Sequence, residues 1–193
     1  MNETWKLVAA SQEIKAISNT WVFKTKSNFD RTKRYKVRLV IQGYEQADYG
    51  ETYTLVAKLA TFRMLIAMTA IHGWELDHMD VVTAFLNPPV EGNIYIKLPE
   101  GLKIAGMSRL DTGALQLVCK LKKALYGLKE APRLWNEHIN SFLYSIGFNR
   151  SVHDSSLYIS SNMMGTGNRA YILLYVDDLL LVSPNRNVIA HLK

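Results

Sequence analysis

The chain has 193 residues, of which 48% are hydrophobic and 21% are charged. This length supports one sizeable core, or a small core with an appended lobe, and the hydrophobic content excludes intrinsic disorder. Lys and Arg number 23 against 17 Asp and Glu, and the resulting net charge of +6 suits a polyanionic partner such as nucleic acid. The single cysteine, Cys119, excludes a disulfide framework and a zinc site built from cysteines.

No export or membrane signal is evident. The first residues after Met1 are polar and charged, without the apolar region of a signal peptide. No apolar run approaches the ~18 residues that a membrane span requires. We therefore expect a protein that is neither secreted nor inserted in a membrane.

The N-terminal region predicts a basic β-hairpin. Residues 21–26 and 35–41 are short runs rich in β-branched and aromatic residues, separated by a polar turn. Basic residues are frequent throughout, and those of the turn are expected to form a solvated face. Lys36 and Arg38 differ because they lie two positions apart within a strand and so share one face. This placement makes a phosphate-facing role plausible.

The remaining elements alternate between helices and strands. Residues 59–71 predict a helix buried on most sides and ended by Gly73, and residues 74–80 predict a strand followed by a helical turn over 81–86. Further strands are expected at 93–98, 115–121 and 156–160, and a long helix runs from Pro132 to about residue 146. An apolar hairpin follows at 171–182. This order predicts an α+β fold with a mostly antiparallel sheet.

Two adjacent aspartates interrupt the apolar hairpin. Burying an unpaired carboxylate costs several kcal/mol, so Asp177 and Asp178 require an explanation. They could form an ordinary turn exposed to water, pair with basic side chains, or bind a divalent cation; from the residues alone the turn is the commonest outcome. Asp80 ends another predicted strand, and carboxylates at strand ends can converge at one sheet edge. Three aspartates would supply the oxygen ligands that Mg²⁺ prefers, although their spacing does not show that they converge.

Six blocks in the same order resemble the reverse transcriptase of copia-type LTR retrotransposons. The first three, in residues 21–24, 34–46 and 48–53, resemble K-W-V-F-K, R-Y-K-A-R-L-V-A-K-G-Y-x-Q and D-Y-x-E-T-F. The others, in residues 79–87, 123–135 and 175–178, resemble M-D-V-K-T-A-F-L-N-G, K-A-L-Y-G-L-K-Q-A-P-R-x-W and Y-V-D-D. The resemblance covers almost the entire chain.

The resemblance implies a right-hand polymerase of fingers and palm, with an antiparallel palm sheet packed on helices. The chain would be a single reverse transcriptase domain fragment, in which residues 1–58 form a fingers-like hairpin region and residues 59–193 carry the catalytic aspartates. The sequence ends soon after the apolar hairpin, so we expect truncation before the thumb. The thumb, RNase H and integrase would be partners within the full Pol polyprotein.

The resemblance also assigns roles to individual residues. Asp80 and Asp177 would be the main ligands of two Mg²⁺ ions, for which Mn²⁺ could substitute, and Asp178 would assist them. Phe85 would be the gate that excludes a 2′-hydroxyl, whereas without the family it would be interpreted as an ordinary core residue. The other residues implied to contact the incoming dNTP or the nascent base pair are Lys36, Arg38, Tyr126 and Gly127.

These assignments predict an RNA-directed DNA polymerase that binds an RNA or DNA template-primer and adds nucleotides to a primer 3′-hydroxyl. Several positions depart from the family pattern, among them Glu130, which stands where Gln is usual. Two alternatives therefore remain: a degenerate or domesticated remnant that at most binds nucleic acid, and a two-metal nuclease of unrelated fold, which does not explain the other blocks. The family implies a location in cytoplasmic particles, with products bound for the nucleus.

Overall fold

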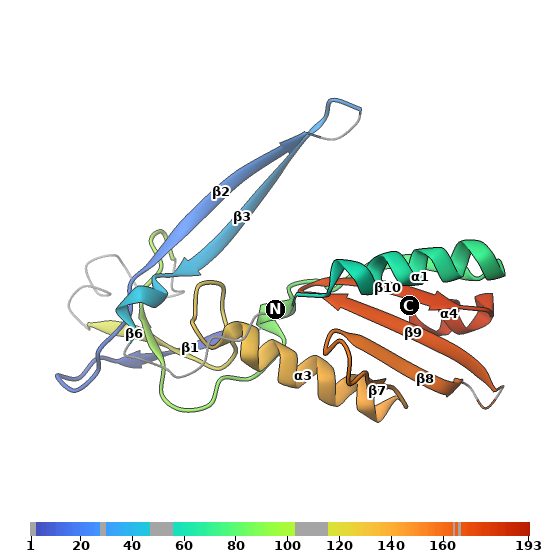
Figure 1. Cartoon of the computed structure of the whole chain (residues 1–193). Helices are drawn as coiled ribbons and strands as arrows, with labels where there is room; N and C mark the ends of the chain where they lie inside the picture. The colour runs from blue at the N-terminus through green and yellow to red at the C-terminus, as the bar shows by residue number, and fades with distance from the viewer. Residues whose placement is uncertain (1–2, 28–29, 47–55, 103–115, 164, 166) are drawn as a thin grey trace. The chain divides into compact units, whose positions relative to one another are not determined.

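The computed structural model describes residues 3–27, 30–46, 56–102, 116–163, 165 and 167–193 (Figure 1). The fold is α+β, as predicted, and the chain divides into two compact units. Unit 1 comprises Met1–Thr52 and Phe85–Leu134, and unit 2 comprises Tyr53–Ala84 and Trp135–Lys193. No helix in the described ranges is long and apolar enough to cross a membrane.

Unit 1 contains the predicted hairpin. Strands β2 (Asn19–Ser27) and β3 (Lys33–Ile41) pair antiparallel, with Asn19 opposite Ile41 and Ser27 opposite Lys33. Both strands are longer than the sequence indicates, because polar residues at the ends of the apolar runs continue the pairing. A short 3₁₀ helix, η1 (Gly43–Glu45), follows β3.

A second sheet of unit 1 has the order β1-β6-β5. It consists of β1 (Trp5–Ala9), β6 (Leu117–Leu121) and β5 (Tyr95–Lys97), all paired antiparallel. Strands β5 and β6 were expected from the sequence, whereas β1 was not, because its five residues carry too weak an alternation. The apolar core of this unit gathers residues of both sheets, of the segment before β2 and of the segment after β6: Ile17, Leu39, Ile41, Ile96, Leu121 and Leu125.

Unit 2 is built on a five-stranded antiparallel sheet with the order β4-β10-β9-β8-β7. Its strands are β4 (Glu75–Asp80), β10 (Asp178–Ser183), β9 (Asn168–Tyr175), β8 (Leu157–Met163) and β7 (Asn149–Arg150). Residues 170–174 of β9 are buried without alternation, which means that both faces of the sheet are covered. Helices α1 (Leu59–His72) and α3 (Ala131–Ser145) lie on opposite sides of this sheet (Figure 1), and α4 (Arg186–Leu192) packs against β10 and β4.

Helix α1 has the predicted limits but not the predicted burial. Gly73 ends it in the left-handed conformation, with φ 63°. Of its apolar residues only Leu65 is fully buried, against Leu173 and Val182 of the sheet. The expectation of a helix buried on most sides is wrong, because a single face of α1 contacts the sheet. Met68 is partly buried against the same cluster, and the other large apolar residues are exposed: Leu59, Phe62, Met64, Ile66 and Ile71.

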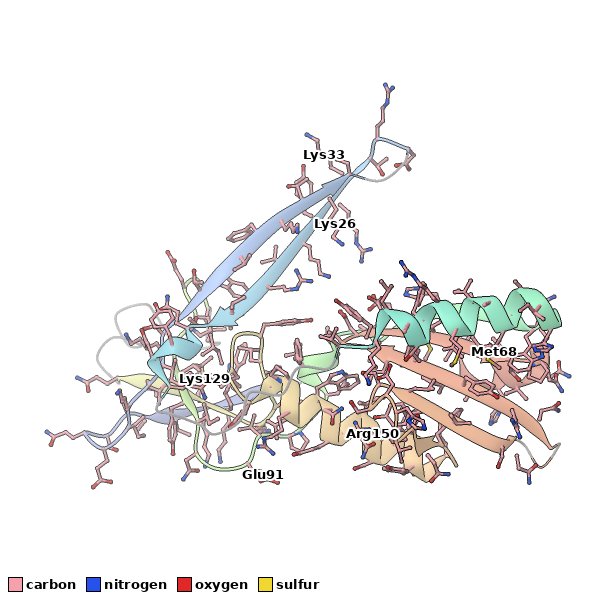
Figure 2. The ribbon with its side chains drawn as sticks, viewed as in Figure 1. Lys26, Lys33, Met68, Glu91, Lys129 and Arg150 are labelled. Atoms are coloured by element: carbon pink, nitrogen blue, oxygen red, sulfur yellow. The ribbon has the colours of Figure 1, made fainter. Side chains whose placement is uncertain are left out.

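A buried polar network joins α3 to the edge of the sheet. Arg150, labelled in Figure 2, donates from Nη2 to Tyr158 Oη at 2.9 Å and to Asn136 Oδ1 at 3.0 Å. Tyr158 is fully buried and donates in turn to Asn140 Oδ1 at 3.2 Å. Because Asn136 and Asn140 lie one turn apart on α3, the network fixes the helix against β7 and β8.

Candidate active site

Two predicted aspartates face each other across neighbouring strands of unit 2. Asp80 is the last residue of β4 and Asp178 is the first residue of β10. The antiparallel register makes them direct cross-strand partners. Opposite residues of such a pair have Cβ atoms ~4.5–5.5 Å apart, and like charges at this spacing repel. The register therefore places two carboxylates at one end of the sheet, in a pairing that a cation would stabilise.

The third aspartate lies in the turn beside this pair. Strand β9 ends at Tyr175, which is opposite Asp178, so Val176 and Asp177 form the two-residue connection. The Val81 amide, next to Asp80, donates to the Asp177 carbonyl at 2.7 Å. This hydrogen bond ties the backbone of the turn to the end of β4. The backbone thus brings Asp80, Asp177 and Asp178 to one end of the sheet.

A histidine also belongs to this sheet end. His78 lies two residues before Asp80 on β4 and therefore shares its face. Its Nε2 lies 2.9 Å from Asp178 Oδ1, and both side chains are more than half exposed. Sequence reasoning did not single out His78, although the period of two along β4 would have placed it beside Asp80.

An apolar hollow of about 380 Å³ adjoins Asp178. It lies between the start of α1 and the sheet, and it is lined by Leu59, Phe62, Leu173, Tyr175 and Leu180 together with His78 and Asp178. One side of the aspartate site is consequently an apolar surface.

The side chains do not form a closed metal-binding cluster. Within the described residues, no group of three or more His, Cys, Asp or Glu is arranged to hold a metal ion. Carboxylates at a sheet end are nevertheless the donor type that holds Mg²⁺ when substrate phosphates and water complete the coordination. Cys119 belongs to the core of unit 1, where burial raises the pKa of its thiol to about 11.

The hairpin of unit 1 has two chemically different faces. Its register places Lys24 opposite Lys36 and Lys26 opposite Arg34. Because like charges directly opposite each other are destabilising, this face is complementary to a polyanion. Figure 2 shows Lys26 and Lys33 along the outer part of the hairpin. The alternate residues form an exposed apolar face: Trp21, Phe23, Tyr35 and Val37.

The basic face continues into an aromatic pair. Arg38 follows Lys36 on the same face of β3, and its guanidinium lies 5.3 Å from the centre of the Tyr126 ring. Tyr126 contacts Phe85 edge to face, with ring centroids 5.3 Å apart. Phe85 lies in the 3₁₀ helix η2 (Ala84–Leu86) and packs against the core of unit 1. Three predicted nucleotide-contacting residues thus form one continuous row.

Gly127 follows this row and makes a close contact of its own. Its φ is +92°, and a Cβ atom added there would meet the Ile41 carbonyl oxygen at 2.0 Å. Gly43 makes the reciprocal approach, because its added Cβ would meet the Gly127 carbonyl oxygen at 2.1 Å. The requirement for glycine is therefore explained by packing of the chain against the end of β3. A contact between Gly127 and a nucleotide stays a prediction.

Glu130, the departure from the family pattern, is a buried carboxylate immediately before α3. It is 8% exposed, and its Oε1 has no hydrogen-bond partner among the described residues. Burial raises the pKa of Glu130, Arg133 opposes this shift, and Glu91 adds to it. The group is destabilising in its charged form.

The structure thus assembles the predicted residues in two sets. Unit 2 holds the three aspartates, and unit 1 holds the row of Arg38, Tyr126 and Phe85, with Lys36 beside it on β3. Residues 48–53, which carry one of the family-like blocks, lie outside the described residues. Besides His78, sequence reasoning assigned no role to Trp135, whose indole contacts the aspartate turn.

The chain is similar in sequence to one protein family and to several known proteins. The sequence model of the family described as "Reverse transcriptase (RNA-dependent DNA polymerase)" matches residues 2–193. The chain is 37% identical, over its full length, to the retrovirus-related Pol polyprotein from transposon TNT 1-94 of Nicotiana tabacum. It is 36% identical, over 93% of its length, to that from transposon RE1 of Arabidopsis thaliana. It spans only 14% and 12% of these two polyproteins. The chain belongs to the reverse transcriptase family.

Proposed function

We propose that this chain is the catalytic segment of an RNA-directed DNA polymerase within a retrotransposon Pol polyprotein. The observation that carries the proposal is the register of β4 against β10, which pairs Asp80 with Asp178 beside Asp177. In the reaction, the primer 3′-oxygen bonds to the α-phosphorus of a dNTP, pyrophosphate leaves, and the hydroxyl proton passes to solvent. Other domains of the polyprotein, including thumb, RNase H and integrase, would complete the enzyme.

The three aspartates would hold two Mg²⁺ ions, or Mn²⁺ in their place. Asp80 and Asp177 would be the main ligands, and Asp178, whose Oδ1 already contacts His78, would assist. When bound, the ions would supply charge neutralisation at the attacking and leaving oxygens. The chain's own contribution is to present the carboxylates from paired strand ends, whose backbone positions are set by the sheet register.

Unit 1 would bind the nucleotide, as the fingers region of the polymerase, and unit 2 would supply the palm sheet. Lys36 and Arg38 would contact the triphosphate, because cations on one strand face complement its charge. The Tyr126 ring supports the Arg38 guanidinium, and the edge contact with Tyr126 restrains Phe85. A restrained aromatic ring is suited to exclude a 2′-hydroxyl. Template bases would supply the sequence information, so the protein needs only phosphate, sugar and shape contacts.

The family suggests that the reaction takes place in cytoplasmic particles whose DNA product is directed to the nucleus. Template-primer and dNTP are the expected partners, and the net charge of +6 favours both. The exposed basic face of the hairpin is the part of unit 1 that would respond most strongly to salt.

Metal binding provides the direct test. We expect Mn²⁺ to bind the chain in a calorimetric titration, and we expect Asp177→Asn to abolish or strongly weaken that binding. Asp77→Asn is the matched control: Asp77 lies on the same strand as Asp80 but on its opposite face, where it pairs with Lys193. Equal Mn²⁺ affinity in wild type and Asp177→Asn would refute the metal assignment.

Primer extension on poly(rA)/oligo(dT) tests the activity. We expect extension by the wild type and by Asp77→Asn, and none by Asp80→Asn. A two-metal nuclease would instead shorten the labelled primer, again in an Asp80-dependent manner. A remnant without enzymatic function would neither bind Mn²⁺ nor extend the primer, and this combined result would overturn the proposal.

A further inference from the structure

The turn that carries Asp177 is held by a buried tryptophan of helix α3. Trp135 lies in the second turn of α3, belongs to unit 2 and is 2% exposed. Its Nε1 donates to the Val176 carbonyl oxygen at 2.6 Å. A buried indole N–H needs an acceptor, since water cannot replace a lost partner there. The Val176 carbonyl is that acceptor, so the indole and the turn constrain each other.

The turn needs such a constraint because its backbone is strained. Val176 has φ +59°, a conformation that β-branched residues strongly avoid. A two-residue hairpin connection usually places glycine, asparagine or aspartate at such a position. Valine persists there only where the surroundings determine the conformation. The hydrogen bond from Trp135 fixes the peptide plane that immediately follows Val176.

Both peptide groups that flank Asp177 are thereby held. The preceding carbonyl, of Val176, accepts from Trp135, and the following carbonyl, of Asp177 itself, accepts from the Val81 amide at 2.7 Å. Two fixed peptide planes determine the direction of the Cα–Cβ bond between them. The carboxylate of Asp177 therefore leaves the turn in a direction set jointly by α3 and by the residue after Asp80.

We propose that Trp135 is a positioning residue for Asp177, acting through the Val176 carbonyl. This inference rests on the proposed function, in which Asp177 is a metal ligand. The indole N–H stabilises the strained conformer of the turn and fixes the backbone from which the Asp177 carboxylate extends, at the sheet end that carries the Asp80–Asp178 pair. Without the N–H, the peptide between Val176 and Asp177 is free to rotate, and the valine can relax out of the left-handed region.

Removing the N–H while keeping the ring tests the inference. Trp135→Phe is the simple variant, and replacement of Trp135 by 3-benzothienylalanine, which has sulfur in place of N–H, preserves the shape of the indole. Trp74→Phe is the matched control: Trp74 belongs to the same unit and stacks on Tyr171, 5.6 Å between ring centroids, away from the turn. Thermal unfolding measures the structural cost of each variant.

We expect both Trp135 variants to weaken Mn²⁺ binding and lower the kcat of primer extension by about 10–100-fold, the usual effect of losing a group that orients a metal ligand. The KM for dNTP should stay near that of the wild type, because nucleotide contacts come from other residues. Trp74→Phe should lower the thermal midpoint without this change in kcat or affinity. If the Trp135 variants match Trp74→Phe in both kcat and Mn²⁺ affinity, the positioning role is refuted.

Hydrogen exchange tests the positioning role independently of activity. The Trp135 indole N–H, assigned by its loss in Trp135→Phe, should exchange far more slowly than that of free tryptophan. The NMR chemical shift of the Asp177 backbone amide should change in the benzothienylalanine variant. A wild-type chain with a protected indole but no Mn²⁺ binding and no extension would refute the proposed function while leaving the support of the turn intact. A fast-exchanging indole would refute the support itself.

Discussion

Asp154 is expected to hold the first turn of α1, the helix whose start borders the hollow beside Asp178. It is 4% exposed, and Oδ2 accepts from the Lys58 amide at 3.1 Å and from Thr61 Oγ1 at 2.6 Å. Its Oδ1 accepts from the Ser156 amide at 2.9 Å. Lys58, at the N-cap position, makes no side-chain capping bond. Asp154 therefore satisfies the amide of the N-cap residue, one of the N–H groups at a helix start that have no partner within the helix.

The cost of Asp154→Ala follows from these three hydrogen bonds. A hydrogen bond to a charged group contributes ~1.5–3 kcal/mol, but the Lys58 amide and the Thr61 hydroxyl can recover some water after the carboxylate is removed. We therefore expect a loss of about 2–3 kcal/mol, which lowers the thermal midpoint of a chain of this size by about 4–12 °C. Part of this loss is the favourable interaction of a carboxylate with a helix N-terminus.

The contribution of Asp154 to stability is expected to decrease at low pH. Burial alone would raise the pKa of Asp154, but the hydrogen bonds from Thr61, Ser156 and Lys58 outweigh it, so the pKa lies below its ordinary value of 3.8. A lowered folded-state pKa means that the charged group contributes its stability fully above the pKa of the unfolded chain. The advantage of wild type over Asp154→Asn should be constant near neutral pH and shrink as the pH falls below about 3.9.

Thermal unfolding followed by circular dichroism, between pH 3 and pH 7.5, is the assay. Asp30→Ala is the control, because Asp30 is exposed and, among the described residues, its side chain bonds to Thr32 within its own turn. Its midpoint should stay close to that of the wild type. A midpoint shift for Asp154→Ala no larger than that for Asp30→Ala would refute the stabilising role of Asp154. A difference in midpoint between wild type and Asp154→Asn that grows on acidification would refute the pKa direction.

Two further substitutions test the interior of unit 1. Glu130→Gln should raise the thermal midpoint at pH 7.5, because burial raises the pKa of Glu130 and makes its charged form destabilising. The gain should disappear below about pH 4.3, because the carboxyl group is then protonated in the folded and the unfolded chain alike. A gain of the same size at pH 3.5 and pH 7.5 would contradict this explanation. Gly127→Ala should destabilise the chain strongly in urea denaturation, since its Cβ would meet the Ile41 carbonyl oxygen at 2.0 Å. Gly73→Ala is its control, with positive φ but open space around it, and equal losses in the two variants would show that backbone strain alone, and not the close contact, explains the effect.

The sequence by itself determined the family, the α+β class and most elements. Six ordered blocks carried the resemblance, and the match over residues 2–193 confirms it. Local chemistry was sufficient for the ends of α1 and α3, because Gly73 and Pro132 act through their own backbone preferences. Alternation along β3 also placed Lys36 and Arg38 on one face, since side-chain direction in a strand depends only on the period of two.

Only the tertiary structure decided which segments meet. A period of two says which residues share a face, but not which strand lies alongside, and β1 shows how little signal a short paired strand carries. The facing of Asp80 and Asp178 depends on the register of strands far apart in the sequence, and the exposure of α1 depends on what covers it. The contact of Gly127 with Ile41 and the bond from Trp135 to Val176 likewise join separate segments. These relations arise from packing between elements, and no local preference encodes them.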